Sequence, residues 1–200
     1  MGKGELSRQK ILVEAFRLFA TMPYERVSFS LLEKEIGISR GSMVYYFRNK
    51  EGLFREVLNS MVLETSSVMA VPDDYKQSLH SFYTYFIQIL KEQQEHMTRI
   101  GIVNINEALM RIENSALTYI ENFKAQVFLW YDEEIQTWKT VIENAVSTGE
   151  INPRVDAAVF GRIFEDCYLG NAFKSVFSAS GYDVESLKDE FDQIYSALKI

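Results

Sequence analysis

The sequence contains few of the residues that form disulfides, metal sites or membrane spans. Its 200 residues include one cysteine, Cys167, and two histidines, His80 and His96. A single cysteine excludes a disulfide within the chain, and these three residues match no recognised spacing of metal ligands, so we expect no metal site. No apolar run approaches the roughly 20 residues that a membrane-spanning helix needs. With a polar stretch at residues 1–9, the chain is predicted to be cytoplasmic and to stay out of the membrane.

Proline and glycine, which interrupt helices, are also scarce, with three and ten copies. Apolar residues recur at steps of three and four along almost the whole chain, which is the period of a helix with one buried face. The pattern therefore predicts an all-α fold, although it leaves open where the helices near residue 120 join. The expected helices are one that ends before residue 22, two short ones on either side of residue 37, and longer ones at about 51–70, 75–98, 103–120, 121–148, 153–178 and 183–198.

Capping residues predict where several of these helices begin. Ser28 fits as the N-cap of the second helix, and Ser30 fits the same role two residues later. An aspartate of the Val71–Asp74 turn is expected to cap the helix that follows it. The Asn152-Pro153 pair is expected to start the penultimate helix, and Asp183 is expected to cap the last one.

The chain also has a shortage of positive charge, with a formal net charge of -7. This total argues against nucleic-acid binding, because phosphate contacts need clustered Lys and Arg. The charge is unevenly distributed, however. Residues 1–50 hold nine basic and five acidic residues, whereas residues 51–200 hold 12 basic and 23 acidic residues. A basic end of this kind is typical of a polyanion-binding segment, or of an ordinary solvated surface.

Residues 28–50 contain two short helical segments separated by a glycine. Gly37 is expected to adopt the left-handed conformation that ends the first segment, and Ser39 is expected to cap the second. The apolar residues spaced to lock the two helices together at a steep angle are Leu32, Ile36, Ile38, Met43 and Phe47. This is the pattern of a helix-turn-helix, whose second helix enters the DNA major groove.

The side chains that this packing leaves exposed are mostly small, polar or hydroxyl-bearing, as suits a helix pressed into a groove. The expected DNA contacts are Ser28, Ser30, Ser39, Arg40, Gly41, Ser42, Val44, Tyr45, Tyr46 and Lys50. Arg40 can make bidentate hydrogen bonds to guanine, and Gly41 lets the backbone approach the bases. Val44 either contacts a thymine methyl group or contributes nothing. Tyr46 is either a phosphate contact or a core side chain.

The same segment resembles the DNA-binding part of TetR-family transcriptional regulators. The resemblance is carried by Leu18-Phe19, Gly37-Ile38-Ser39 and the run from Arg40 to Phe54, in the order and spacing of the family. Three positions depart from the family pattern. Pro23 stands where glycine is usual, Val44 replaces an aromatic residue, and Tyr46 replaces a common histidine.

The resemblance implies a three-helix DNA-binding domain at residues 1–52 and a helical ligand-binding and dimerisation domain at residues 53–200, with about nine helices in all. It further implies a homodimer through the last two helices, about 153–178 and 183–198. Such a dimer binds a pseudo-palindromic double-stranded DNA operator and usually represses transcription until a small-molecule effector binds. The many aromatic residues of the last two helices fit this interface. The alternative is that they fill the core of one chain.

Residues 82–138 are rich in aromatic side chains, which line pockets for apolar ligands and also fill protein cores. The expected effector contacts are Phe86, His96, Arg99, Phe123, Trp130 and Phe164. Among them, His96 and Arg99 are expected to be the polar anchors. The sequence does not identify the effector, and it indicates no cofactor.

Two other classes of function are less consistent with the sequence. An enzyme needs a catalytic constellation, a phosphate-binding loop or a metal set, and the sequence has none of these patterns. The acidic pairs Glu133-Glu134 and Glu165-Asp166 are interpreted as solvated helix faces. A helical interaction module that has lost DNA binding is supported only by Val44 and the acidic total.

Overall fold

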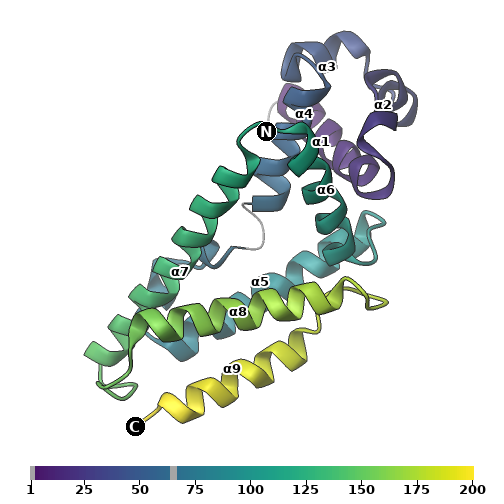
Figure 1. Ribbon diagram of the computed structural model, residues 1–200. Coiled ribbons are helices and arrows are strands. Elements are labelled where there is room, and N and C mark those ends of the chain that lie inside the picture. Colours follow the sequence, from purple (N-terminus) through teal and green to yellow (C-terminus); the bar gives the residue numbers. More distant parts are fainter. Residues whose placement is uncertain (1–2, 64–66) are drawn as a thin grey trace.

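Helices form the regular structure of the chain in a computed structural model, which describes residues 3–63 and 67–200 (Figure 1). In chain order the described elements are α1 (Lys3–Thr21), η1 (Tyr24–Arg26), α2 (Phe29–Ile36), α3 (Arg40–Phe47), α4 (Lys50–Leu58), η2 (Asn59–Leu63), η3 (Val68–Ala70), η4 (Asp73–Tyr75), α5 (Leu79–Arg99), α6 (Ile105–Tyr119), α7 (Phe123–Ser147), α8 (Ala157–Ser175) and α9 (Val184–Leu198). Element η2 is a turn of π-helix, and the other η elements are 3-10 turns. The predicted all-α fold with about nine helices is confirmed over these residues.

Helices α1 to α4 gather at one end of the molecule, and the carboxyl terminus lies at the other end (Figure 1). Helix α1 packs against α2, α4 and α6. Its Phe19 ring lies 5.6 Å from the ring of Tyr24 and 4.6 Å from that of Phe54 on α4. Helix α4 therefore shares its core with α1, and the domain boundary expected at residue 52 falls inside this helix.

The continuous helix expected at 51–70 is wrong. Helix α4 gives way to η2 after nine residues, and residues 64–66 of the expected range lie outside the described part. Ser67 then starts a different structure, because its hydroxyl accepts a hydrogen bond from Met69 N at 3.0 Å and donates one to the buried carboxylate of Glu134 on α7. A side chain on another helix thus holds the backbone out of the helical path.

The start of α5 also differs from the expectation. Ser78, and not an aspartate of the Val71–Asp74 turn, caps this helix by accepting a hydrogen bond from Ser81 N at 3.2 Å. The carboxylate of Glu150 adds a second cap, because it accepts from Leu79 N at 2.9 Å and from the next backbone N–H at 3.0 Å. An acidic group at a helix start is favourable for both hydrogen bonding and the helix dipole.

The join between α6 and α7 lies at Asn122, which adopts a left-handed conformation with φ of 65°. Helix α8 begins later than expected. The side chain of Asn152 accepts a hydrogen bond from Arg154 N at 2.9 Å and so forms a turn, while Asp156 caps the helix by accepting from Val159 N at 3.1 Å. The Asn152-Pro153 start is therefore wrong by one turn, because the asparagine bonds to its own loop.

The expected cap of the last helix is confirmed, since Asp183 accepts a hydrogen bond from Ser186 N at 3.1 Å.

Trp138 lies at the centre of an aromatic core shared by α5, α7, α8 and α9. Its ring centroid lies 4.9 to 6.2 Å from those of Phe82, Phe86, Phe164 and Phe191. All five side chains are fully buried. This core joins the four helices into one bundle.

None of the described helices is long and apolar enough to cross a membrane.

Candidate functional site

The first candidate region is the exposed front of α3. The helix is held from the turn before it, where Gly37 has a φ of 67° and Ser39 accepts a hydrogen bond from Ser42 N at 3.3 Å. Ser28, and not Ser30, caps α2 by accepting from Leu31 N at 3.2 Å. Two short capped helices on either side of a left-handed glycine are the local structure expected for a helix-turn-helix.

Packing decides which side of α3 faces solvent. Leu32 of α2 and Met43 and Phe47 of α3 are buried, as predicted. On the opposite side, Tyr45 is 82% exposed and Val44 is 44% exposed. The remaining expected contacts on this helix follow the same surface: Arg40 and Gly41 are exposed, and Ser42 is half-buried.

A groove of about 360 Å³ lies between the start of α2, the exposed side of α3 and the turn between α3 and α4. Five of the expected DNA contacts line this groove, namely Ser28, Ser30, Arg40, Val44 and Lys50. Arg48 and Asn49 line it too and were not expected. Arg48 is exposed and follows α3 directly, with a φ of 65°. A basic residue directly after the recognition helix is the sequence signal that could have identified it as a DNA contact.

Two expected contacts are engaged within the protein. The ammonium group of Lys50 donates a hydrogen bond to Tyr24 O at 3.1 Å and lies 4.0 Å from the centre of the Tyr24 ring. Tyr46 is half-buried, and its hydroxyl lies close to Gly4 of α1. A Cβ added at Gly4 would be 3.2 Å from this hydroxyl. Both side chains therefore help to join α3 and α4 to their neighbours, and their DNA contacts stay predictions.

The second candidate region is a cavity of about 290 Å³ between α6, α7 and α8, which we call the bundle cavity. Its lining is mostly apolar or aromatic and includes Trp130, Tyr131, Tyr168, Phe173, Tyr182 and Glu113. The indole N–H of Trp130 donates a hydrogen bond to Leu63 O of η2 at 2.8 Å. The cavity wall is thus bonded to the segment that leaves the amino-terminal helices.

The expected effector contacts are dispersed in the structure. Trp130 lines the bundle cavity, whereas Phe86 and Phe164 pack around Trp138 in the aromatic core. Phe123 is buried at the start of α7, and both His96 and Arg99 are exposed on α5. These six contacts stay predictions.

The structure contradicts the interpretation of two acidic pairs as solvated faces. Glu133 and Asp166 are exposed, but Glu134 and Glu165 are 0% and 1% exposed. One oxygen of Glu134 accepts from the Ser67 hydroxyl, and the other accepts from the next backbone N–H at 3.1 Å. The indole N–H of Trp138 donates to Glu165 Oε2 at 3.1 Å, while Glu165 Oε1 is buried without a hydrogen-bond partner among the described residues.

Burial makes these carboxyl groups weak acids. It raises the pKa of Glu134 to about 7, against the lowering effect of the Ser67 hydroxyl. Burial, and then the nearby charge of Glu134, raise the pKa of Glu165 to about 8. Both groups therefore bind protons more tightly than exposed glutamates do.

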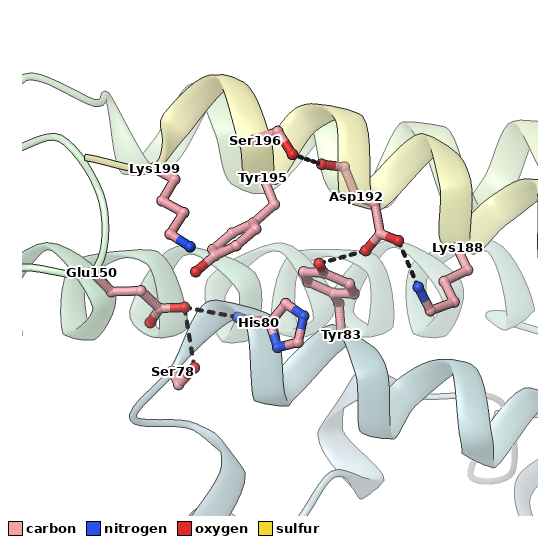
Figure 2. Close-up of a pocket in the computed structure, with 9 residues that line it drawn as sticks. All are labelled: Ser78, His80, Tyr83, Glu150, Lys188, Asp192, Tyr195, Ser196 and Lys199. Carbon is pink, nitrogen blue, oxygen red and sulfur yellow. Dashed lines mark hydrogen bonds and ion pairs between the residues drawn. The ribbon is translucent and has the colours of Figure 1, made fainter.

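A third hollow, between α5 and α9, is more polar, and several of its side chains bond to one another (Figure 2). The carboxylate of Asp192 accepts from the Tyr83 hydroxyl at 2.7 Å and from Lys188 Nζ at 2.5 Å. Glu150 faces it and caps α5 through Ser78 and His80. We therefore interpret this hollow as a structural joint between α5 and α9.

The outer surface of α8 carries apolar side chains. Phe173 is 60% exposed and Phe177, just after the helix, is 78% exposed, while Val159 and Ile163 are partly exposed. Other aromatic residues of the last two helices, namely Phe164, Tyr168 and Phe191, fill the core of the chain. Part of the aromatic content therefore fills the core of the chain, as the alternative expected. An apolar surface remains exposed on α8, and the dimer interface stays a prediction.

The chain is similar in sequence to known regulators. Residues 11–57 match a family described as "Bacterial regulatory proteins, tetR family". The chain is 20% identical to IcaR of Staphylococcus aureus (strain COL), the HTH-type negative transcriptional regulator of the biofilm operon icaADBC. This match spans 199 residues and covers 96% of the chain and 97% of IcaR.

Solved structures share the fold. NalD, the secondary repressor of the MexAB-OprM multidrug efflux pump in Pseudomonas aeruginosa, superimposes with a TM-score of 0.65 at 17% identity, covering 98% of both chains. SmeT in complex with triclosan superimposes with a TM-score of 0.66 at 12% identity, covering 96% of this chain and 90% of SmeT. These similarities extend over the helical bundle as well as the amino-terminal helices.

Proposed function

The chain belongs to the TetR family of transcriptional regulators, and we propose that it binds a pseudo-palindromic DNA operator as a homodimer and represses transcription. Residues 1–52 read the DNA, and residues 53–200 bind a small-molecule effector and hold the dimer together. The negative regulation by IcaR and the repressor role of NalD support the sign of this regulation. The complex of SmeT with triclosan supports a small-molecule ligand.

The observation that carries the proposal is that α3 packs into the core on one side and is exposed on the other. Met43 and Phe47 fix the helix from below, and Arg40, Val44 and Tyr45 extend from its exposed side. A rigid helix with a cation and small side chains at its front is the geometry that major-groove reading requires. Glu33 accepts a hydrogen bond from Arg40 N at 3.1 Å, which satisfies one backbone N–H at the start of α3. This bond involves the Arg40 backbone, and the guanidinium group is the part of Arg40 that contacts DNA in the proposed complex.

The homodimer is formed by the outer surfaces of α8 and α9. Phe173 and Phe177 are large, apolar and exposed, and side chains of this kind at a surface favour association with a second apolar surface. Two copies related by a twofold axis place their α3 helices roughly 34–36 Å apart, which is one turn of DNA.

The effector acts through the connection between the bundle cavity and α4. Trp130 bonds to Leu63, and Glu134 bonds to Ser67 and Val68. Helix α7 is therefore bonded both to the end of η2 and to the start of η3, which follow α4 in the chain. Helix α4 shares its core with α1. A ligand that moves α7 can therefore change the spacing of the two reading helices, to the extent that it binds one state more tightly.

An electrophoretic mobility shift tests DNA binding, with the purified full chain and an operator selected from genomic fragments. Arg40→Ala is expected to weaken the specific complex roughly tenfold to a hundredfold, because a bidentate contact to a base contributes about 1–3 kcal/mol. Arg154→Ala is the matched control, since Arg154 is an exposed arginine in the loop between α7 and α8 and lies outside the helix-turn-helix.

The specific complex is expected to weaken steeply with salt, because protein cations displace condensed counterions from the phosphates. Equal affinity of the two variants would remove Arg40 from the DNA contacts. If no genomic fragment binds the wild-type chain specifically, the protein is better explained as an interaction module that has lost DNA binding.

A further inference from the structure

We propose that the bundle cavity binds an organic cation with an apolar body, and that the carboxylates of Glu134 and Glu165 recognise its positive charge. This inference rests on the proposed function, because it names the chemical class of the effector. It is carried by the shape of the cavity, by the position of the two glutamates and by the buried oxygen that has no partner.

The cavity offers a suitable surface to the apolar body of such a ligand. Its volume of about 290 Å³ accommodates a molecule built around one aromatic ring. Trp130, Tyr131, Tyr168 and Tyr182 all line it. Aromatic rings attract cations through their faces, and this attraction is strongest where water is excluded.

The two glutamates lie one helical turn from residues that line this cavity, and they are buried behind its wall rather than part of the lining. Glu134 follows Trp130 and Tyr131 on α7 by four and three residues, and Glu165 precedes Tyr168 on α8 by three. Residues at these steps lie on the same face of a helix, one turn apart. The bond from Trp138 to Glu165 ties the two helices together at that level, so the carboxyl groups lie between α7 and α8 just beyond the aromatic lining.

The hydrogen bonding of this pair is incomplete. Glu134 uses both oxygens to hold Ser67 and Val68, whereas Glu165 Oε1 is buried with no partner in the described part of the chain. A buried polar atom without a partner is costly, and such atoms in folded proteins need an explanation. A ligand cation that lies against Glu165 compensates for the missing hydrogen bond by its charge.

The surrounding charge favours a cation over other ligands. The titratable groups near the pair are Glu113 on α6, Tyr131 and Glu133 on α7, Asp166 and Tyr168 on α8, and Tyr182 before α9. All of them are acids, and the described ion pairs do not include Glu134 or Glu165. An anionic ligand is therefore repelled once a carboxyl group ionises, and a cation takes the place of the bound proton.

Calorimetric titration of the full chain tests this inference, with benzyltrimethylammonium as the probe and neopentylbenzene as its uncharged carbon isostere. The cation is expected to bind, and Glu165→Gln is expected to weaken its binding roughly tenfold to a hundredfold, as for other contacts to a buried charge. Glu95→Gln is the matched control, because Glu95 is exposed on α5. Circular dichroism of each variant establishes that the fold is retained.

Proton release provides a second measurement that a structural role of Glu165 does not produce. Because the cation displaces a proton, the observed heat is expected to change with the ionisation enthalpy of the buffer, and less so in Glu165→Gln. Equal binding of the isostere, no binding of the cation at millimolar concentration, or unchanged binding by Glu165→Gln would each overturn the inference. Operator binding is measured separately, so a failed cation test leaves the proposed DNA function standing.

Discussion

In the unfolded chain Glu165 titrates near its ordinary pKa of 4.5, whereas in the folded chain burial, and then the charge of Glu134, raise this pKa to about 8. Between these two values the folded chain keeps a proton that the unfolded chain has released. The free energy of unfolding therefore falls as the pH rises through this window. Replacing Glu165 with glutamine removes the titrating group, so the variant is expected to be free of this decline.

The size of the effect follows from the two pKa values. Below a pH of 4.5 the carboxyl group is protonated in both states and has no effect, and above a pH of about 8 the destabilisation is complete. One pKa unit corresponds to about 1.4 kcal/mol, so the full loss is about 5 kcal/mol as an upper bound. Because Glu134 and Glu165 share one environment, their ionisations are coupled, and the measured loss belongs to the pair.

Urea unfolding at one fixed protein concentration measures this loss, at about pH 5 and about pH 9. The quantity of interest is the free energy of unfolding of Glu165→Gln minus that of the wild type, because titrating groups that do not interact with Glu165 cancel in this difference and the coupled ionisation of Glu134 stays in it. It is expected to increase by several kcal/mol from the lower to the higher pH. A constant difference would refute the reasoning, since it would mean that Glu165 is already ionised in the folded chain.

Two further substitutions test the junction of α3 and α4 and the dimer. A Cβ at Gly52 would lie 2.2 Å from Phe47 O, so Gly52→Ala forces the backbone at the end of α3 to move. It is expected to lower the free energy of unfolding by about 1–3 kcal/mol in a denaturant titration and to abolish operator binding, and a variant that binds normally would contradict this. Phe177 is 78% exposed, so Phe177→Asp is expected to leave the helical content unchanged and to shift the protein toward monomer in light scattering. A variant that remains dimeric would place the interface elsewhere.

The helix-turn-helix was predictable because its determinants are local. Ser28 and Ser39 cap helices within three residues of themselves, and Gly37 provides the left-handed turn between them. Leu32 and Met43 are buried as their spacing indicates. Short-range capping and apolar spacing are properties that one segment contains by itself.

Most of the errors have a different physical origin, since they depend on residues distant in the sequence. The start of α8 is the exception, because Asn152 bonds to its own loop. Glu134 bonds to Ser67, inside the range of the helix expected at 51–70, and Glu150 reinforces Ser78 at the start of α5. The same limit applies to the buried glutamates. Glu165 stands beside Asp166 in the sequence, and only the packing of α7 against α8 separates the buried member of the pair from the exposed one.

In the proposed complex with a cation, the bundle cavity and the amino-terminal helices are connected by groups whose charge the ligand changes. When a cation takes the place of the protons on Glu134 and Glu165, the carboxylate of Glu134 becomes an acceptor for the ligand as well as for Ser67 and Val68. Competition of this kind acts on the segment directly after α4, which shares its core with α1. A neutral ligand of the same shape fills the cavity without altering this acceptor. Charge, rather than occupancy alone, therefore provides the difference in affinity between two states that any effector needs in order to release the operator.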